Sequence, residues 1–144
     1  MSVKEKLSAL GLTLPTAAAP VAAYVPAIKS GNLIFTAGQL PVVDGKLVKE
    51  GKVGREVTAE DAKELAQICA LNALAAISLV ADLDQVERVV RVGGFVNCAP
   101  GFTAIPGVVN GASEFLLKVF GDVNGKHART ATNEIAASAF SAQI

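Results

Sequence analysis

The sequence has few aromatic, cysteine or histidine residues and no excess of charge of either sign. Its 144 residues include no tryptophan, one tyrosine, one histidine and two cysteines, and thirteen basic residues balance thirteen acidic ones. A neutral chain exerts no net attraction on a nucleic-acid backbone or an anionic membrane surface. Scarce aromatic side chains also leave no platform on which bases could stack. Nucleic acid is therefore a disfavoured partner.

Common motifs of catalysis and ligand binding are absent as well. The chain has no G-x-G-x-x-G, phosphate-loop, C-x-x-C or G-x-S-x-G motif. A single histidine excludes a multi-histidine metal site within one chain, and Cys69 and Cys98 lack the spacing of metal ligands. The cysteines are interpreted as buried thiols, and His127 as an exposed or hydrogen-bonded loop residue instead of a catalytic base. We expect no metal and no cofactor, so chemistry must rest on arginine, backbone groups, carboxylates or water.

The long uncharged runs do not indicate a membrane protein. Residues 65–81 carry no charge, but they include polar side chains and fall short of the roughly 20 apolar residues that a spanning helix needs. Residues 7–28 and 92–113 are interrupted by prolines, which would leave backbone hydrogen bonds unsatisfied in lipid. No signal peptide is visible at the N-terminus. The sequence therefore predicts a cytoplasmic protein without a membrane partner.

What the chain does have is a large supply of small apolar residues. Hydrophobic residues make up 51% of it and charged residues 18%, which is typical of a folded domain and not of a disordered one. The length predicts one domain over residues 1–144. Twenty-five alanines allow elements to approach closely, and such faces often continue into a subunit interface.

Local signals predict a helix followed by an extended connector over residues 1–19. Ser2 and Glu5 have the spacing of a capping box, and Gly11 is suited to end the helix in a left-handed conformation. Prolines at 15 and 20 prevent regular structure in the connector. Further along the chain, patterns of turn residues and apolar periodicity predict a hairpin over residues 23–36, a hairpin over 42–48, a helix over 58–81, a strand over 86–97, a helix over 108–121 and a strand over 127–132.

This order of elements predicts an α+β layer. Two helices can cover only one face of a sheet, so the apolar residues of the other face favour burial against another subunit. Adjacent glycines at 93 and 94 interrupt the predicted strand and indicate a bulge or a close approach by another backbone.

Several of these segments resemble one known family. Residues 30–41 read S-G-N-L-I-F-T-A-G-Q-L-P, similar to the family's G-N-L-[LIV]-F-x-S-G-Q-[IL]-P, and residues 23–27 read A-Y-V-P-A, similar to G-P-Y-S-Q-A. Val108-Val109-Asn110 stands where the family has a helix start with asparagine, and residues 127–130, H-A-R-T, stand where it has P-A-R-S. Over about residues 20–135 the chain thus resembles a divergent branch of the Rid/YjgF family of reactive-intermediate deaminases.

The resemblance implies a chorismate-mutase-like mixed β-sheet with two helices packed on one face, assembled as a homotrimer with a ligand cleft at each subunit interface. The reaction it implies is hydrolysis of small 2-imino or 2-enamino acids to 2-keto acids and ammonia. A small carboxylate metabolite is then the expected ligand. Arg129 is expected to be the catalytic anchor that holds its carboxylate, and the expected substrate-binding residues are Tyr24, Gly38, Asn110, Arg129 and, through its main-chain carbonyl, Ala131.

The chain departs from the family pattern in three places. Ala37 replaces the usual hydroxyl residue, and Ala131 stands where some active members carry cysteine. The L-P-x-x-x-x-V-E-[IV]-E ending is missing, which predicts a shortened C-terminus without the last strand and its glutamate; residues 140–144 are a candidate surrogate edge. Glu134 is the nearest remaining carboxylate and is interpreted as a solvated or interface residue.

Catalysis itself therefore stays open at the level of the sequence. A non-catalytic trimer that binds a 2-keto acid is the first alternative, and the missing glutamate favours it. A ribonuclease or translation inhibitor is a distant third, because the neutral charge offers no phosphate track.

Overall fold

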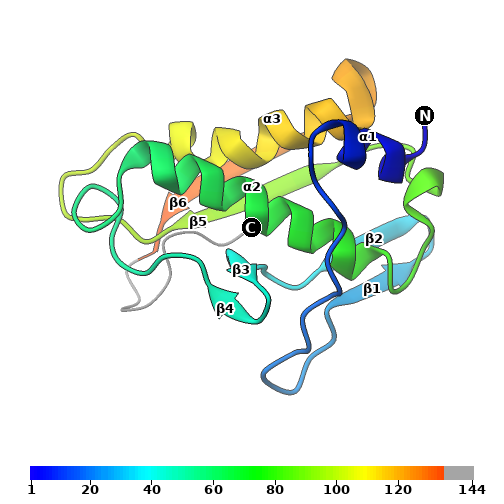
Figure 1. Cartoon of the computed structure of the whole chain (residues 1–144), viewed down its shortest axis with the longest axis horizontal. Coiled ribbons are helices and arrows are strands. Elements are labelled where there is room, and N and C mark those ends of the chain that lie inside the picture. Colours follow the sequence, from blue (N-terminus) through cyan, green and yellow to red (C-terminus); the bar gives the residue numbers. More distant parts are fainter. Residues whose placement is uncertain (135–144) are drawn as a thin grey trace.

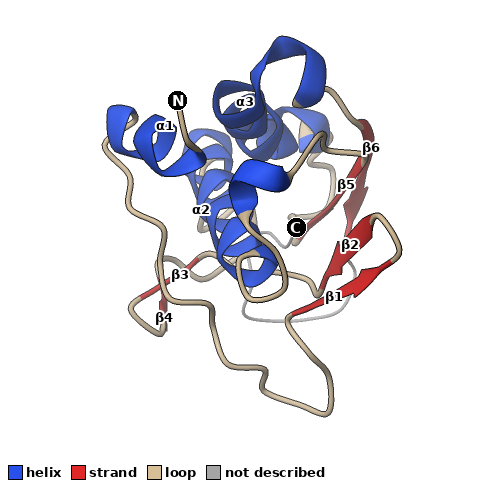
Figure 2. Ribbon diagram, turned by 90° about the vertical axis from the view of Figure 1, so that its right-hand side faces the viewer, coloured by secondary structure: helices blue, strands red, loops and turns tan. Residues whose placement is uncertain are grey.

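A computed structural model of the chain describes residues 1–134, and its helices lie on one side of the molecule with the main strands on the other (Figures 1 and 2). The elements in chain order are α1 (Val3–Ala9), β1 (Ala27–Ser30), β2 (Leu33–Thr36), β3 (Val42–Val43), β4 (Lys46–Leu47), α2 (Ala59–Ile77), a 3-10 turn η1 (Leu83–Gln85), β5 (Arg91–Val96), α3 (Ile105–Asn124) and β6 (Ala128–Asn133). Among these residues, no helix is long and apolar enough to cross a membrane.

The predicted N-terminal helix is confirmed as α1, with its capping box. The Ser2 hydroxyl oxygen accepts from the Glu5 N–H at 3.1 Å, and the Ser2 N–H donates to the Glu5 carboxylate at 2.7 Å. Gly11 follows the helix with a φ of +73°, in the left-handed region that favours glycine. Val3 and Leu7 are buried in the core, and the Val3 N–H donates to Asp84 in η1. The helix is therefore attached to the same core as the rest of the chain.

Both predicted hairpins form, but the first is shorter than expected. β1 pairs with β2 from Ala27 opposite Thr36 to Ser30 opposite Leu33. The expected strand residues before Ala27 lie outside the ladder, because Pro26 has no N–H to donate and only its carbonyl accepts, from Ala37. In the second hairpin the turn residues Asp44 and Gly45 both have positive φ, at 50° and 77°, as a tight type I′ turn requires.

The two long helices appear where their periodicity placed them. Thr58 caps α2 by accepting from the Asp61 N–H at 3.1 Å, and the helix ends at Ile77, a turn earlier than predicted. α3 begins with Pro106 in its first turn, where the missing N–H does no harm. Gly121 has a φ of +85° and kinks α3, so the predicted end at this glycine corresponds to a break followed by one more turn.

α3 connects two parallel strands, β5 and β6. Arg129 lies opposite Val92, and Ala131 lies opposite Gly94. Because alternate strand residues point to opposite faces, Val92, Gly94 and Arg129 share the face toward the helices. A Cβ at Gly94 would lie 2.5 Å from a methyl carbon of Val109. The predicted close approach at the glycine pair is therefore made by a helix side chain, and the regular register shows no bulge.

The expected single mixed sheet is the main correction to the fold. Hydrogen bonds within residues 1–134 join the strands into three separate two-stranded sheets: β1–β2, β3–β4 and β5–β6. A two-residue turn joins β1 to β2 and β3 to β4, and the α3 crossover joins β5 to β6. The α+β layering is confirmed, since α2 and α3 cover one side of the strands (Figure 2).

Small residues bring the two long helices into contact. The face of α2 toward the core carries the fully buried Ala62, Ala66 and Ala70. On α3, a Cβ at Gly111 would lie 1.8 Å from the backbone carbonyl oxygen of Lys63. The helix backbones therefore touch at this point, which explains part of the alanine content.

The strand face opposite the helices exposes large apolar side chains. We call this the open face; its exposed apolar residues are Ile28 (56%), Leu33 (47%), Phe35 (57%) and Phe95 (46%). Several large apolar side chains exposed on strand faces are the kind of surface that often marks a protein–protein contact. Burial against another copy of the chain stays a prediction.

Candidate functional site

Arg129 on β6 is tied to one face of α3. Its Nη1 group donates to the Asn110 side-chain oxygen at 2.7 Å and to the Ser113 hydroxyl at 3.2 Å. Its Nη2 group donates to the Pro106 carbonyl at 3.3 Å. Asn110 and Ser113 are three residues apart, so they lie next to each other on the helix surface. Arg129 faces them because it lies opposite Val92 of β5, on the strand face toward the helices. We call Arg129 and these three acceptors the Arg129 anchor.

The acceptors in the Arg129 anchor are all neutral. An amide, a hydroxyl and a carbonyl fix the guanidinium without cancelling its charge, and no carboxylate of residues 1–134 forms a salt bridge with it. A guanidinium has five N–H donors, of which three are engaged here. Arg129 is partly exposed. The anchor therefore offers a held positive charge with free donors, which is the chemistry of an anion-binding group.

His127 is linked to the Arg129 anchor through Ser113. The imidazole Nε2 lies 2.9 Å from the Ser113 hydroxyl, and Nδ1 lies 2.6 Å from the Gly125 carbonyl oxygen. This confirms the sequence interpretation of a hydrogen-bonded histidine but adds a link that it missed. The signal was available: His127 precedes Arg129 by two strand positions and Ser113 follows Asn110 by three helix positions. Only the register of β6 beside β5 shows that His127 and Arg129 face Ser113 and Asn110 on α3.

The other predicted site residues fall into two groups. Asn110 contacts Arg129 directly, and Ala131 lies two positions further on β6, on the same face and partly buried. Tyr24, 46% exposed, and the exposed Gly38 flank the same end of the β1–β2 hairpin. Within the described part of the chain, no hydrogen bond joins this second group to Arg129. One copy of the chain does not assemble the whole predicted set.

The region after β6 is described only at its first residue. The Glu134 N–H donates to the Val96 carbonyl oxygen at 2.9 Å, and the residue is partly buried. The predictions about the shortened C-terminus and a surrogate edge at 140–144 concern residues outside the described range.

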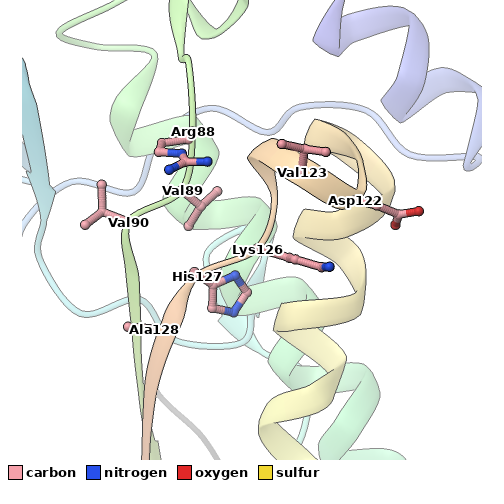
Figure 3. A pocket seen from close by; sticks show the side chains of 8 residues that line it. All are labelled: Arg88, Val89, Val90, Asp122, Val123, Lys126, His127 and Ala128. Carbon is pink, nitrogen blue, oxygen red and sulfur yellow. The ribbon is translucent and has the colours of Figure 1, made fainter.

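A surface hollow of about 590 Å³ lies beside His127 but does not include Arg129 (Figure 3). It is formed where the segment before β5 meets the end of α3 and the start of β6. Its lining residues are Arg88, Val89, Val90, Asp122, Val123, Lys126, His127 and Ala128. Its two positive side chains and one carboxylate are exposed. The hollow is therefore a surface separate from the Arg129 anchor.

The two cysteines are buried thiols, as predicted. Cys69 and Cys98 are 0% and 5% exposed. Burial raises the pKa of both thiols, and the nearby positive charge of Lys52 partly offsets the effect at Cys98. Neither is poised to act as a thiolate at neutral pH. No group of three or more histidine, cysteine, aspartate and glutamate residues within 1–134 is placed to hold a metal ion.

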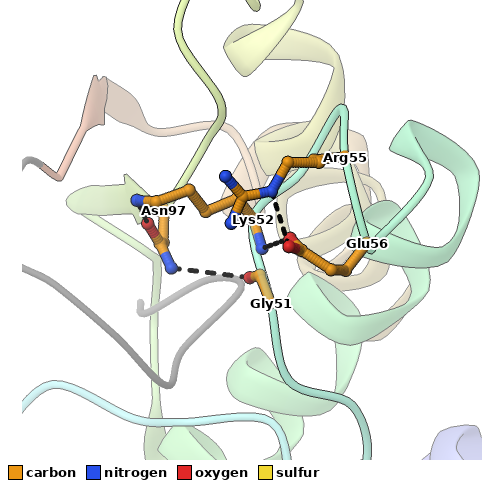
Figure 4. A network of polar contacts seen from close by, with 5 residues as sticks. All are labelled: Gly51, Lys52, Arg55, Glu56 and Asn97. Carbon is orange, nitrogen blue, oxygen red and sulfur yellow. Dashed lines mark hydrogen bonds and ion pairs between the residues drawn. The ribbon is translucent and has the colours of Figure 1, made fainter.

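A second polar network fastens a loop and is structural (Figure 4). The Lys52 ammonium donates to the buried Asn97 side chain at 2.7 Å, and Asn97 donates to the Gly51 carbonyl at 3.4 Å. Glu56 accepts from the Lys52 N–H and from Arg55. These two hydrogen bonds lower the pKa of the Glu56 carboxyl. The network ties the loop before α2 to the end of β5, and within it Arg55 is paired with Glu56.

Comparison with known proteins extends over nearly the whole chain. The family described as "YjgF/chorismate mutase-like, putative endoribonuclease" matches residues 4–139. Protein TCP17 of Trypanosoma cruzi is 41% identical over 130 residues, covering 90% of this chain and 81% of that protein.

Solved structures with the same fold include two bacterial proteins. The Agrobacterium tumefaciens protein Atu1372, of unknown function, is 38% identical with a TM-score of 0.88, covering 99% of this chain and 88% of its own. A Shewanella oneidensis protein named as a "putative endoribonuclease" is 28% identical with a TM-score of 0.94, covering 99% and 95%. The family match and both structural alignments extend over almost all of the chain, and the chain belongs to the YjgF/chorismate mutase-like family.

Proposed function

We propose that this protein hydrolyses small 2-imino and 2-enamino acids to 2-keto acids and ammonia, at clefts between the subunits of a cytoplasmic homotrimer. The observation that carries the proposal is the Arg129 anchor, in which three neutral acceptors hold a guanidinium that keeps its charge. Such a group is suited to grip the carboxylate that all these substrates share.

The chemistry needs little beyond orientation. A 2-enamino acid tautomerises to the imine, and water adds to the imine carbon. The C–N bond then breaks and ammonia leaves, so substrate plus water gives keto acid plus ammonia. Because a protonated imine is already electrophilic, fixing the carboxylate and admitting one water is enough to favour attack. In this proposal Arg129 is the catalytic anchor, Asn110 positions it, and the Ala131 carbonyl faces the bound substrate.

The trimer is proposed from the open face and from the division of the site. Ile28, Phe35 and Phe95 expose about half of their surface or more in the single chain. A neighbouring copy covering this face would also be able to bring its Tyr24 and Gly38 toward Arg129. The two groups of predicted residues would then line one cleft.

The proposal is tested by supplying an unstable 2-enamino acid. A dehydratase releases 2-aminoacrylate from serine, and its decay is followed by ultraviolet absorbance with and without the protein. Wild type should accelerate the loss, and Arg129→Ala should not. Arg55→Ala is the control, because Arg55 is an exposed arginine paired with Glu56. Wild-type decay no faster than in buffer would show that the enzymatic claim is wrong.

A second candidate is a non-catalytic trimer that binds a 2-keto acid. The supporting observation is that no carboxylate of residues 1–134 forms an ion pair or a hydrogen bond with Arg129. Calorimetry with 2-ketobutyrate separates the two candidates. Saturable binding without turnover of 2-aminoacrylate supports the second, and no saturable heat excludes it.

RNA cleavage comes third, suggested by the endoribonuclease names of the family and of the Shewanella protein. The balanced charge of the chain gives it no support. Parallel loss of RNA cleavage and of ligand binding in Arg129→Ala would reverse this ranking.

A further inference from the structure

We propose that Ser113 and His127 are positioning residues that fix the orientation of the Arg129 guanidinium. We call the series Gly125 carbonyl, His127, Ser113 and Arg129 the Ser113–His127 relay. The identity of the ligand that Arg129 binds rests on the function proposed above. The hydrogen bonds of the relay do not depend on that function.

The hydrogen bonds of the relay have a defined direction. A carbonyl oxygen only accepts, so His127 Nδ1 carries a proton and donates to Gly125 at 2.6 Å. In the neutral imidazole Nε2 is then an acceptor, and the Ser113 hydroxyl donates to it at 2.9 Å. The Ser113 oxygen is left to accept from Arg129 Nη1 at 3.2 Å. Donation therefore runs in one direction, from Arg129 to Ser113, from Ser113 to His127 and from His127 to Gly125.

The far end of the relay is fixed in the backbone. Gly125 is buried at the end of α3, and its N–H donates to the Gly121 carbonyl at 2.8 Å. A Cβ at Gly125 would lie 2.7 Å from the Gly121 carbonyl oxygen and 2.8 Å from that of Leu116. The carbonyl that accepts the His127 hydrogen bond therefore belongs to tightly packed backbone. His127 is held against a rigid support.

Holding Nη1 at two points sets the plane of the guanidinium. Asn110 and Ser113 together engage both N–H groups of Nη1, and Pro106 engages one of Nη2. Among residues 1–134 nothing accepts from the Nε N–H, and with an Nη2 N–H it makes the fork that a carboxylate accepts with two bonds. A fork that is already oriented loses less conformational freedom when the anion binds.

A serine hydrogen-bonded to a histidine is also the geometry of a nucleophile and its base. The surroundings favour positioning. Ser113 lies within the regular part of α3, its oxygen accepts from Arg129, and it is not among the residues that line the hollow beside His127. Labelling by a fluorophosphonate distinguishes the two roles, because it modifies only a nucleophilic serine.

The first test reads the guanidinium directly by nitrogen NMR of the arginine side chains. The Arg129 signals are assigned by their loss in Arg129→Lys. Wild type should show separate Nη1 and Nη2 resonances because rotation is hindered. Ser113→Ala should merge them, and Ser113→Thr, which keeps the hydroxyl, should restore them. Ser78→Ala at the C-terminal cap of α2, where the Ser78 hydroxyl donates to the Ala75 carbonyl, is the matched control and should leave them unchanged.

The second test reads ligand affinity. For 2-ketobutyrate, Ser113→Ala should raise the dissociation constant about tenfold, as expected for one weakened hydrogen bond to a charged group. His127→Asn keeps an amide N–H for Gly125 but places no group where the imidazole Nε2 meets Ser113, and should give a smaller rise. With 2-aminoacrylate the change should appear in KM more than in kcat, because orientation acts on binding.

The outcomes separate the relay from the proposed function. Unchanged Arg129 signals in Ser113→Ala would overturn the relay, and so would fluorophosphonate labelling of Ser113. Wild type that neither binds 2-ketobutyrate nor consumes 2-aminoacrylate would overturn the proposed function, while the NMR test would still decide whether the relay exists.

Discussion

Two arginines of this chain show how neighbours decide what a guanidinium can do. Arg55 forms an exposed ion pair with Glu56, so the carboxylate of Glu56 neutralises its positive charge within the loop. Arg129 is bonded only to neutral groups among the described residues. The same side chain is therefore a structural contact in one place and a candidate receptor for an anion in the other.

Replacing Arg129 with lysine separates charge from shape. A lysine ammonium keeps the positive charge but cannot donate to Asn110 and Ser113 and also present a planar fork. We expect Arg129→Lys to weaken 2-ketobutyrate binding by at least about tenfold. Calorimetry measures this, and unchanged affinity would show that charge alone is enough.

The thiols provide a test of burial at single residues. Burial raises the pKa of Cys69 and Cys98, so less thiolate is present at pH 8 than in the unfolded chain. We expect native protein to react with a disulfide reagent on the order of a hundredfold more slowly than unfolded protein, since reaction requires opening. Cys98 should react first, because Lys52 favours its thiolate. A native thiol that reacts at the unfolded rate would contradict this.

At the scale of elements, local signals predicted most of the structure. Capping residues, turn residues and apolar periodicity located α1, both hairpins, α2, α3 and β6, because each depends on neighbours in sequence. The separation of the strands into three sheets and the contact between Ser113 and His127 depend on register and helix phase, which the sequence did not supply. Arg129 and Asn110 were identified through family resemblance, and their hydrogen bond required the structure.

The contact between α2 and α3 predicts opposite effects for two similar substitutions. Gly111→Ala places a methyl group against the Lys63 carbonyl and should destabilise the fold by about 1–3 kcal/mol. Gly107→Ala, in the same helix but with nothing near its Cβ, should be neutral or stabilise by up to about 1 kcal/mol. Urea unfolding measures both. Equal effects would contradict the close contact.

The capping box of α1 predicts a dependence on pH. Hydrogen bonds from the Ser2 backbone and side chain lower the pKa of the Glu5 carboxyl. Its contribution to stability is therefore full above its unfolded pKa and is lost as pH falls through the lower folded pKa. Wild type should be more stable than Glu5→Gln at about pH 7 and equal to it at about pH 2. A difference that persists in acid would refute the assignment.

At the scale of the whole molecule, the open face leads to a prediction about assembly. Light scattering should give three times the chain mass of 14.7 kDa. Phe35→Asp places a charge in the middle of the apolar surface and should yield monomers, with loss of activity although Arg129 is unchanged. Leu79→Asp, an exposed residue just after α2, should leave the trimer intact. A wild-type monomer would remove the inter-subunit cleft.

The parts of the site are also distributed unevenly along the chain. Among the described residues, every hydrogen-bond partner of Arg129 belongs to residues 106–113 of α3, in the crossover between β5 and β6, whereas Tyr24 and Gly38 flank the first hairpin. Under the proposed function, gripping the anionic head and enclosing the rest of the ligand are tasks of separate chain segments. Substitutions near the first hairpin would then alter ligand preference, whereas binding of the carboxylate by the Arg129 anchor would stay the same.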